Sequence, residues 1–162
     1  MWAMEGTVRI AESVTRDDLG YGAATRAGAG LMTRPPGSRF RVVIADDTPD
    51  IRQLLRWAIE PDERYEVVGE AANGAEALDL VGSLDVDAIV LDLAMPVMDG
   101  LQAIPKIKVA SPDTRILVLS GFDEDAMAGE ALSRGADAYL EKGVALAEIT
   151  RVLDDICTKG AA

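Results

Sequence analysis

Five polar residues follow apolar runs in which the chain is expected to form strands. They are Asp46, Asp47, Asp92, Ser120 and Lys142. Because the carboxyl ends of parallel strands meet at one edge of a sheet, these side chains are expected to lie close together there. Three carboxylates, a hydroxyl and an ammonium would then share one site, and this combination favours a functional role.

The three carboxylates indicate a metal site. Carboxylates that lie together repel one another, and a hard divalent cation relieves that repulsion. Oxygen ligands with positions left open for water favour Mg²⁺ over Zn²⁺. A carboxylate beside such a cation can attack a phosphoryl group and become an acyl phosphate. Lys142 would then balance charge on the transferred oxygens, and Ser120 would donate a hydrogen bond to the new group.

Each of these residues also has a purely structural interpretation. An Asp at the end of a strand usually caps the next helix or forms a turn, and this applies to all three here. Ser120 precedes a glycine and would ordinarily belong to a turn, Lys142 would be a solvated charge, and Tyr139 would be a half-buried strand aromatic. Their occurrence together, each at its own strand and in this order along the chain, favours function.

Strand-like and helical patterns alternate along residues 40–158. Short apolar runs predict strands, and apolar residues spaced three and four apart predict helices. Because the strand runs are almost continuously apolar, helices are expected to cover both faces of the sheet. The predicted fold class is α/β, a doubly wound, five-stranded parallel sheet flanked by five helices. The expected strands are 41–45, 65–69, 87–91, 115–119 and 137–140, and the expected helices are 51–59, 73–81, 101–107, 124–134 and 146–156.

Residues 1–39 differ in composition from the rest of the chain. They hold five Arg and four acidic residues, a net charge of +1, so the total of −12 leaves −13 for residues 40–162. Gly and Ala dominate residues 20–30, and a Pro-Pro-Gly turn precedes the first strand. We expect a flexible N-terminal extension over 1–39, a globular domain over 40–158 and a C-terminal tail over 159–162. A short amphipathic helix around Val8–Val14 and a chain start near Met32 are alternatives.

The composition excludes several classes of protein. Histidine is absent, which removes histidine acid–base catalysis, histidine metal sites and phosphohistidine carriers. The single Cys157 rules out an internal disulfide and is typical of a reducing compartment, so a cytoplasmic location is expected. The net charge of −12 disfavours direct binding to nucleic acid or to an anionic membrane. The chain also contains no apolar run long enough to predict a membrane span.

The polar residues lie in blocks that resemble the receiver domain of two-component response regulators, which has the CheY-like fold. The blocks are Val42–Asp47, Val90–Gly100, Ile116–Gly121 and Gly135–Lys142, and the stretch from Asp92 to Gly100 is the most specific. The resemblance spans about residues 40–158 and implies the flavodoxin-like strand order 2-1-3-4-5. It also implies Mg²⁺ as cofactor and a sensor histidine kinase or phosphotransfer protein as phosphoryl donor.

The resemblance implies a role for each matching acidic residue. Asp92 looks like the phosphoryl acceptor. Asp47 looks like a direct Mg²⁺ ligand, Asp46 would assist through water, and Ala94 would contribute its backbone carbonyl. Ala94 and Phe122, which flank the site, offer no polar side chain to orient an attacking water. Slow loss of the phosphoryl group is therefore expected.

The resemblance also implies a switch. Ser120 looks like the hydroxyl that responds to the phosphoryl group, Tyr139 like the aromatic that follows it, and Lys142 like the lysine that pairs with the phosphoryl oxygens. Movement of Ser120 would let Tyr139 turn inward. The surface formed by the fourth helix, fifth strand and fifth helix would then change, and partners would bind there.

Three positions bear on how closely this chain follows the family's pattern. Gly143 stands where the family usually has a proline with a cis peptide bond, so this loop is expected to be looser or to reach the same turn with a trans bond. Pro105 falls inside a predicted helix, which it should kink or whose start it should shift. Gly129 either weakens the fourth helix or permits close packing against it.

Together these features predict a phosphoryl-accepting signalling switch that is not an enzyme. Because the sequence ends soon after the last predicted helix, we expect a stand-alone receiver that contacts an unknown downstream protein or a second copy of itself. One alternative is an aspartate-nucleophile phosphohydrolase, which usually carries Asp-x-Asp after its first strand. Another is an interaction module of this shape without phosphorylation. A Rossmann domain is disfavoured, since two acids follow the first strand in place of a glycine-rich loop.

Overall fold

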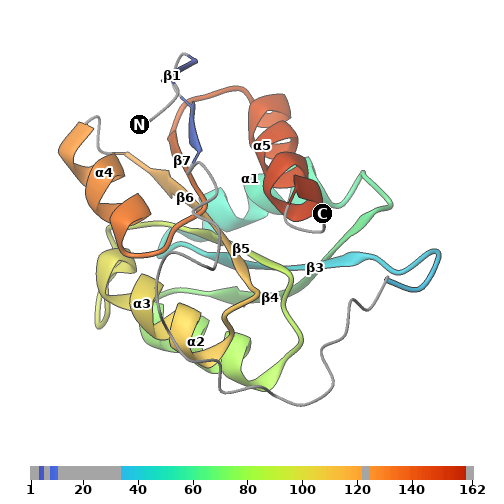
Figure 1. Ribbon diagram of the computed structural model, residues 1–162, viewed down its shortest axis with the longest axis horizontal. Coiled ribbons are helices and arrows are strands. Elements are labelled where there is room, and N and C mark those ends of the chain that lie inside the picture. The colour runs from blue at the N-terminus through green and yellow to red at the C-terminus, as the bar shows by residue number, and fades with distance from the viewer. Residues whose placement is uncertain (1–3, 6–7, 11–33, 122–124, 160–162) are drawn as a thin grey trace.

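Five parallel strands make up most of the sheet in the computed structural model, which describes residues 4–5, 8–10, 34–121 and 125–159 (Figure 1). Their order is β4-β3-β5-β6-β7, which is the predicted order 2-1-3-4-5. Neighbouring strands pair in parallel register, so all five carboxyl ends lie at one edge of the sheet. The strands are β3 (Phe40–Ala45), β4 (Tyr65–Ala71), β5 (Ala88–Leu91), β6 (Arg115–Ser120) and β7 (Ala138–Glu141).

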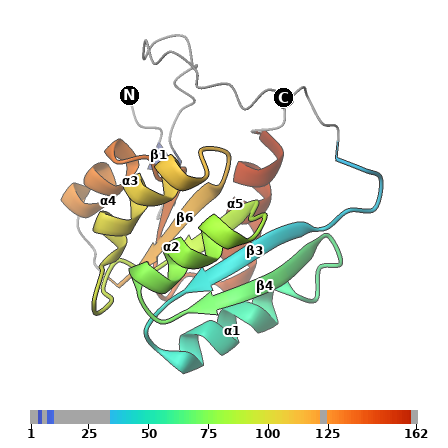
Figure 2. The same ribbon diagram turned by 90° about the horizontal axis from the view of Figure 1, so that it is seen from below.

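Five helices cover the two faces of this sheet, as predicted. Helices α2, α3 and α4 pack on one face, and α1 and α5 pack on the other (Figures 1 and 2). Successive strand residues point to opposite faces, so Ile89 packs in the core under α2, α3 and α4, and Val90 packs in the core under α1 and α5. No helix in the described ranges is both long and apolar enough to cross a bilayer. The helices are α1 (Pro49–Ile59), α2 (Gly74–Ser83), α3 (Gly100–Ala110), α4 (Asp125–Ser133) and α5 (Leu146–Lys159).

Local side-chain signals begin and end several helices. The Asn73 side chain accepts a hydrogen bond from the backbone N–H of Glu76 at the start of α2. Asp99 and Gln102 form a reciprocal capping box at the start of α3. Gly135, with a φ of 120°, ends α4 in the left-handed region that favours glycine. These caps fix where α2 and α3 begin, which is the edge of the sheet at which the acidic residues lie.

Pro105 lies inside α3 without shifting the start of the helix, which remains at Gly100. A proline has no N–H to donate to the carbonyl four residues earlier, which here belongs to Leu101. The guanidinium of Arg134, just after α4, donates a hydrogen bond of 3.0 Å to that Leu101 oxygen. The residue that follows α4 therefore supplies the donor that Pro105 lacks.

Two short strands extend the sheet beyond the five that the sequence predicts. Strand β2 (Val8–Ile10) pairs antiparallel with β7, and β1 (Met4–Glu5) pairs antiparallel with β2. The alternative of a helix around Val8–Val14 is wrong for residues 8–10, and residues 11–14 lie outside the described part of the chain. The open edge of β7 offers unpaired backbone groups, which explains why a short segment pairs there despite its weak strand pattern.

Arg34 connects the segment before β3 to the body of the sheet. Its guanidinium donates to both carboxylate oxygens of Asp87, at 3.0 and 2.7 Å. The guanidinium carbon also lies 4.3 Å from the centroid of the Phe40 ring. Arg34 therefore ties the end of the segment 1–39, which its composition sets apart, to the domain.

Candidate functional site

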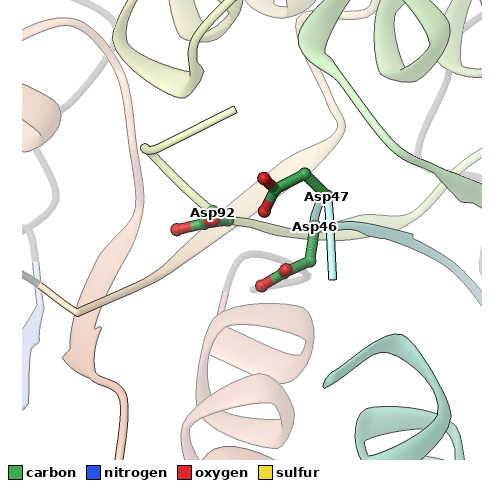
Figure 3. Close-up of side chains that lie close together, drawn as sticks. All are labelled: Asp46, Asp47 and Asp92. Atoms are coloured by element: carbon green, nitrogen blue, oxygen red, sulfur yellow. The ribbon is translucent and has the colours of Figure 1, made fainter. Parts of the chain in front are cut away.

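Three carboxylates meet beyond the ends of two adjacent strands. Asp46 and Asp47 follow β3, and Asp92 follows β5 (Figure 3). One carboxylate oxygen from each residue lies within 4.8 Å of the other two. Asp46 and Asp92 are buried, with exposed fractions of 1% and 3%, whereas Asp47 is exposed. The cluster thus opens to solvent on the side of Asp47.

Lys142, directly after β7, bridges the two buried carboxylates. Its ammonium nitrogen lies 2.7 Å from an oxygen of Asp46 and 3.2 Å from an oxygen of Asp92. The Lys142 backbone N–H donates to the carbonyl of Ser120 at 2.7 Å, which holds this loop beside the end of β6. Among the described residues all peptide bonds are trans, and Gly143 has a φ of 103°. Gly143 therefore makes this turn with a trans bond, because glycine tolerates positive φ.

The surroundings shift the pKa values of both Asp92 and Lys142. Burial raises the pKa of Asp92 above its ordinary value, the Lys142 charge opposes that rise, and the Asp46 charge adds to it. Burial acts to lower the pKa of Lys142, but its hydrogen bond to Asp46 and the charges of Asp92 and Asp46 outweigh burial and raise it. The lysine therefore stays charged, and it offsets part of the repulsion between the two carboxylates.

The backbone and carboxylate of Asp46 are both held by neighbours. Its N–H donates to the carbonyl of Ala71 at 3.0 Å, and its carboxylate accepts from the N–H of Thr48 at 2.9 Å. Its carbonyl oxygen accepts a 2.7 Å hydrogen bond from the guanidinium of Arg52 on α1. The sequence does not single out Arg52, because arginine is common on the polar face of an amphipathic helix and nothing in the spacing indicates its partner.

The loop between β5 and α3 packs closely against Asp92. A Cβ atom at Gly100 would lie 2.3 Å from the carbonyl oxygen of Asp92, so only glycine fits there. Val97 has a φ of 67°, unusual for a β-branched residue, and the N–H of Met98 donates to the carbonyl of Pro96 across it. This tight turn explains why the stretch from Asp92 to Gly100 carries the most specific pattern in the sequence.

The remaining predicted site residues lie near the same edge. The Ala94 side chain is exposed, and its backbone N–H donates a long hydrogen bond of 3.4 Å to an Asp92 oxygen. Ser120 is fully buried at the end of β6, and Tyr139 is 3% exposed within the core under α2, α3 and α4. An inward turn of Tyr139 thus starts from a ring that is already buried. Phe122 lies outside the described residues.

The donor set fits a hard divalent cation. Asp46, Asp47 and Asp92 offer only oxygen ligands, which suit Mg²⁺, and the exposed Asp47 leaves room for water in the coordination shell. Three carboxylates against the single ammonium of Lys142 leave the cluster with net negative charge. These three aspartates are therefore the residues that would hold such an ion.

A separate apolar groove lies between α2 and α3. It has a volume of about 610 Å³ and is formed by the C-terminal halves of α2 and α3, with Leu78, Pro105 and Val109 among its lining residues. Both helices begin at the carboxylate edge and run away from it, so the groove lies apart from the acidic cluster. It contributes no side chain to that site.

Comparison with known proteins agrees with this geometry. Residues 42–154 match the family described as the response regulator receiver domain. The transcriptional regulatory protein YhcZ of Bacillus subtilis is 40% identical over 112 residues, which cover 69% of this chain and 52% of that protein. The chain spans about half the length of the curated relatives that it matches.

Two solved structures share the fold. The signal receiver domain of NarL from Mycobacterium tuberculosis is 36% identical, with a TM-score of 0.71, and the match covers 74% of this chain and 97% of that one. A chain of the CheX–CheY–BeF3–Mg²⁺ complex from Borrelia burgdorferi is 25% identical, with a TM-score of 0.68, and the match covers 74% of this chain and 90% of that one. The carboxylate cluster, its lysine and the matched residues 42–154 lead to one conclusion: the chain belongs to the family of response regulator receiver domains.

Proposed function

We propose that this protein is a phosphoryl-accepting switch in a two-component system, with Asp92 as the acceptor. The observation that carries the proposal is the juxtaposition of the buried Asp92 with Lys142 and with two further carboxylates at one edge of the sheet. A buried nucleophile beside a fixed cation suits a reaction in which charge develops on transferred oxygens. The phosphoryl donor is a sensor histidine kinase or a phosphotransfer protein.

The proposed reaction is phosphoryl transfer from a phosphohistidine to Asp92. A carboxylate oxygen of Asp92 attacks the phosphorus, the phosphorus–nitrogen bond of the donor phosphohistidine breaks, and an acyl phosphate forms on Asp92. The Lys142 ammonium, 3.2 Å from Asp92, compensates the added negative charge. Asp47 and the Ala94 carbonyl would hold Mg²⁺ together with Asp92, Asp46 would assist through water, and the bound ion would offset charge on the phosphoryl oxygens.

The readout is a change in the surface formed by α4, β7 and α5. In this proposal Ser120 donates a hydrogen bond to the new phosphoryl group and draws the end of β6 towards it. Because the Tyr139 ring is already buried among residues that pack under α4, a shift at Ser120 reaches α4 through repacking rather than through entry of the ring. A downstream protein or a second copy of the chain would bind the altered surface.

Two other functions make different predictions. An aspartate-nucleophile phosphohydrolase would turn over a phosphate ester many times, whereas a receiver takes up one phosphoryl group per chain. An interaction module without phosphorylation would take up none. The ion pairs of Lys142 with Asp46 and Asp92 support the receiver, because an interaction module has no need for two buried carboxylates around one cation.

Intact-mass spectrometry after incubation with acetyl phosphate and Mg²⁺ tests the proposal. The wild type should gain one phosphoryl group, and Asp92→Asn should gain none. Asp85→Asn is the matched control, since Asp85 is exposed and precedes β5 whereas Asp92 follows it. Equal labelling of wild type and Asp92→Asn, or no labelling of the wild type, would contradict the proposal.

A further inference from the structure

We propose that Arg52 is a positioning residue for the acidic site, and that it sets the direction of the Asp47 carboxylate by holding the Asp46–Asp47 peptide group. This inference rests on the proposed function, because it assigns Arg52 a part in binding the Mg²⁺ that phosphoryl transfer uses. In this role Arg52 acts through the backbone of Asp46.

The guanidinium of Arg52 is anchored at two points. One nitrogen donates to the carbonyl oxygen of Asp46 at 2.7 Å, and another donates to a carboxylate oxygen of Glu70 at 3.1 Å. The Arg52 side chain is only 17% exposed. Glu70 belongs to β4, which pairs with β3, the strand that Asp46 follows, so the arginine links α1 to the sheet at the edge where the site lies.

The contact with the Asp46 carbonyl has a consequence for Asp47. A carbonyl and the next N–H belong to one planar peptide unit, so a bond to the Asp46 oxygen also restrains rotation about the bonds that orient Asp47. Asp47 is exposed, and its own side-chain bond, to the Thr48 hydroxyl, is long at 3.5 Å. The direction of its carboxylate therefore depends on the backbone, which Arg52 holds.

The charge of Arg52 is offset by its ion pair with Glu70. An effect of Arg52 on the metal site is therefore expected to come from its hydrogen bond to Asp46 rather than from its charge. Glu70 accepts hydrogen bonds from both Arg52 and Arg56, at 3.1 and 2.8 Å. Arg56 lies one turn further along α1 and pairs with Glu60 as well as with Glu70. Arg56 thus shares the helix, the charge and the Glu70 partner, and serves as the matched control.

The test measures Mg²⁺ affinity by calorimetric titration of the full chain, with thermal unfolding of each variant measured in parallel. Loss of a group that orients a metal ligand typically weakens binding 10–100-fold, so Arg52→Met should weaken Mg²⁺ binding about tenfold while Arg56→Met stays within about twofold of wild type. Both variants lose a bond to Glu70, so similar unfolding temperatures are expected. Arg52→Lys should show an intermediate loss of Mg²⁺ affinity, because one ammonium group cannot bond to both the Asp46 carbonyl and the Glu70 carboxylate as the guanidinium does.

The outcomes separate this inference from the proposed function. Wild-type Mg²⁺ affinity in Arg52→Met, or equal weakening in Arg52→Met and Arg56→Met, overturns the inference alone, provided that the wild type still takes up a phosphoryl group on Asp92. A wild type that binds no Mg²⁺ overturns both. If Arg52→Met does not unfold cooperatively, Arg52→Lys decides: about threefold or greater weakening supports the inference, and an affinity within about twofold of wild type overturns it.

Discussion

Lys142 pairs more closely with Asp46 than with Asp92. The two distances are 2.7 and 3.2 Å, and the Asp46 carboxylate is only 2% exposed. Asp46 therefore holds the Lys142 ammonium next to Asp92, the proposed acceptor, in the absence of a phosphoryl group. A cation held in this way needs little reorganisation when charge develops on the transferred group.

Replacement of Lys142 by Met should have opposite effects on metal binding and on phosphoryl uptake. Without the ammonium, the carboxylates carry uncompensated charge, so Mg²⁺ should bind severalfold more tightly. Phosphoryl uptake by Asp92 should slow, because the cation that balances the transferred oxygens is gone. The Met variant should also lose about 1–3 kcal/mol of unfolding free energy without Mg²⁺, the usual cost of leaving a buried charged group without its hydrogen-bond partner.

Urea unfolding with and without Mg²⁺, together with calorimetric titration, measures these effects. The expected pattern is a larger stabilisation by Mg²⁺ in Lys142→Met than in the wild type. Weaker Mg²⁺ binding in the variant would contradict the view that Lys142 and the metal compensate the same carboxylates.

Gly129→Ala should stabilise α4 by about 1 kcal/mol, the usual difference between the two residues inside a helix. A Cβ atom at Gly129 would meet no atom within 4 Å, so close packing does not explain this glycine. The alternative that Gly129 permits close packing against α4 is therefore wrong. The other interpretation, that Gly129 weakens the helix, is the one that this prediction tests. If α4 moves in response to phosphorylation, the Ala variant should also show smaller amide chemical-shift changes in α4 when Asp92 is phosphorylated.

Gly100→Ala is the contrasting control for this experiment. Its Cβ atom would lie 2.3 Å from the carbonyl oxygen of Asp92, so this variant should lose stability and disturb the site. Chemical denaturation of both variants tests the contrast. A destabilised Gly129→Ala protein would mean that this glycine has a conformational role that its surroundings do not reveal.

The contribution of Glu70 to stability should depend on pH with a definite sign. Burial acts to raise the pKa of Glu70, but the hydrogen bonds from Arg56 and Arg52 outweigh it and lower the pKa below its ordinary value. A carboxyl group with a lowered folded-state pKa stabilises the fold above its unfolded-state pKa, and this contribution is lost as the pH falls through the folded-state value.

Glu70→Gln should therefore be less stable than the wild type at neutral pH, by less than about 1 kcal/mol because the pair is partly exposed. The difference should shrink as the solution is made acidic, below the ordinary pKa of a glutamate. Urea midpoints across an acidic pH series measure it. A difference that grows on acidification would contradict the assigned direction of the pKa shift.

The acyl phosphate on Asp92 should decay slowly, with a half-life well beyond seconds. The Ala94 side chain is exposed beside Asp92 and has no polar group with which to orient an attacking water. Decay can be followed by intact mass after removal of the phosphodonor. Ala94→Asn, which adds an amide at this position, should shorten the half-life, and a wild-type half-life of seconds would contradict the prediction.

The order of the elements and the identity of the acidic site could be predicted from the chain alone. Apolar runs ending in Asp46 and Asp92 predict buried parallel strands, and a parallel sheet must bring their carboxyl ends together. The helix starts at Asn73 and Asp99 are equally local, because a side chain caps an N–H only three residues away. Such features depend on neighbours in sequence, so they can be predicted from the sequence alone.

Contacts that join separate helices and strands were decided only by the tertiary structure. The sequence does not indicate that Arg52 donates a hydrogen bond to the Asp46 carbonyl or that Arg134 donates one to the Leu101 carbonyl. It also does not indicate that β2 pairs with β7. Each of these depends on where a long side chain or a backbone edge finds a partner after the sheet and helices have packed. Periodicity and capping report local preferences, whereas the choice of partner for a guanidinium or an open strand edge is made by the assembled fold.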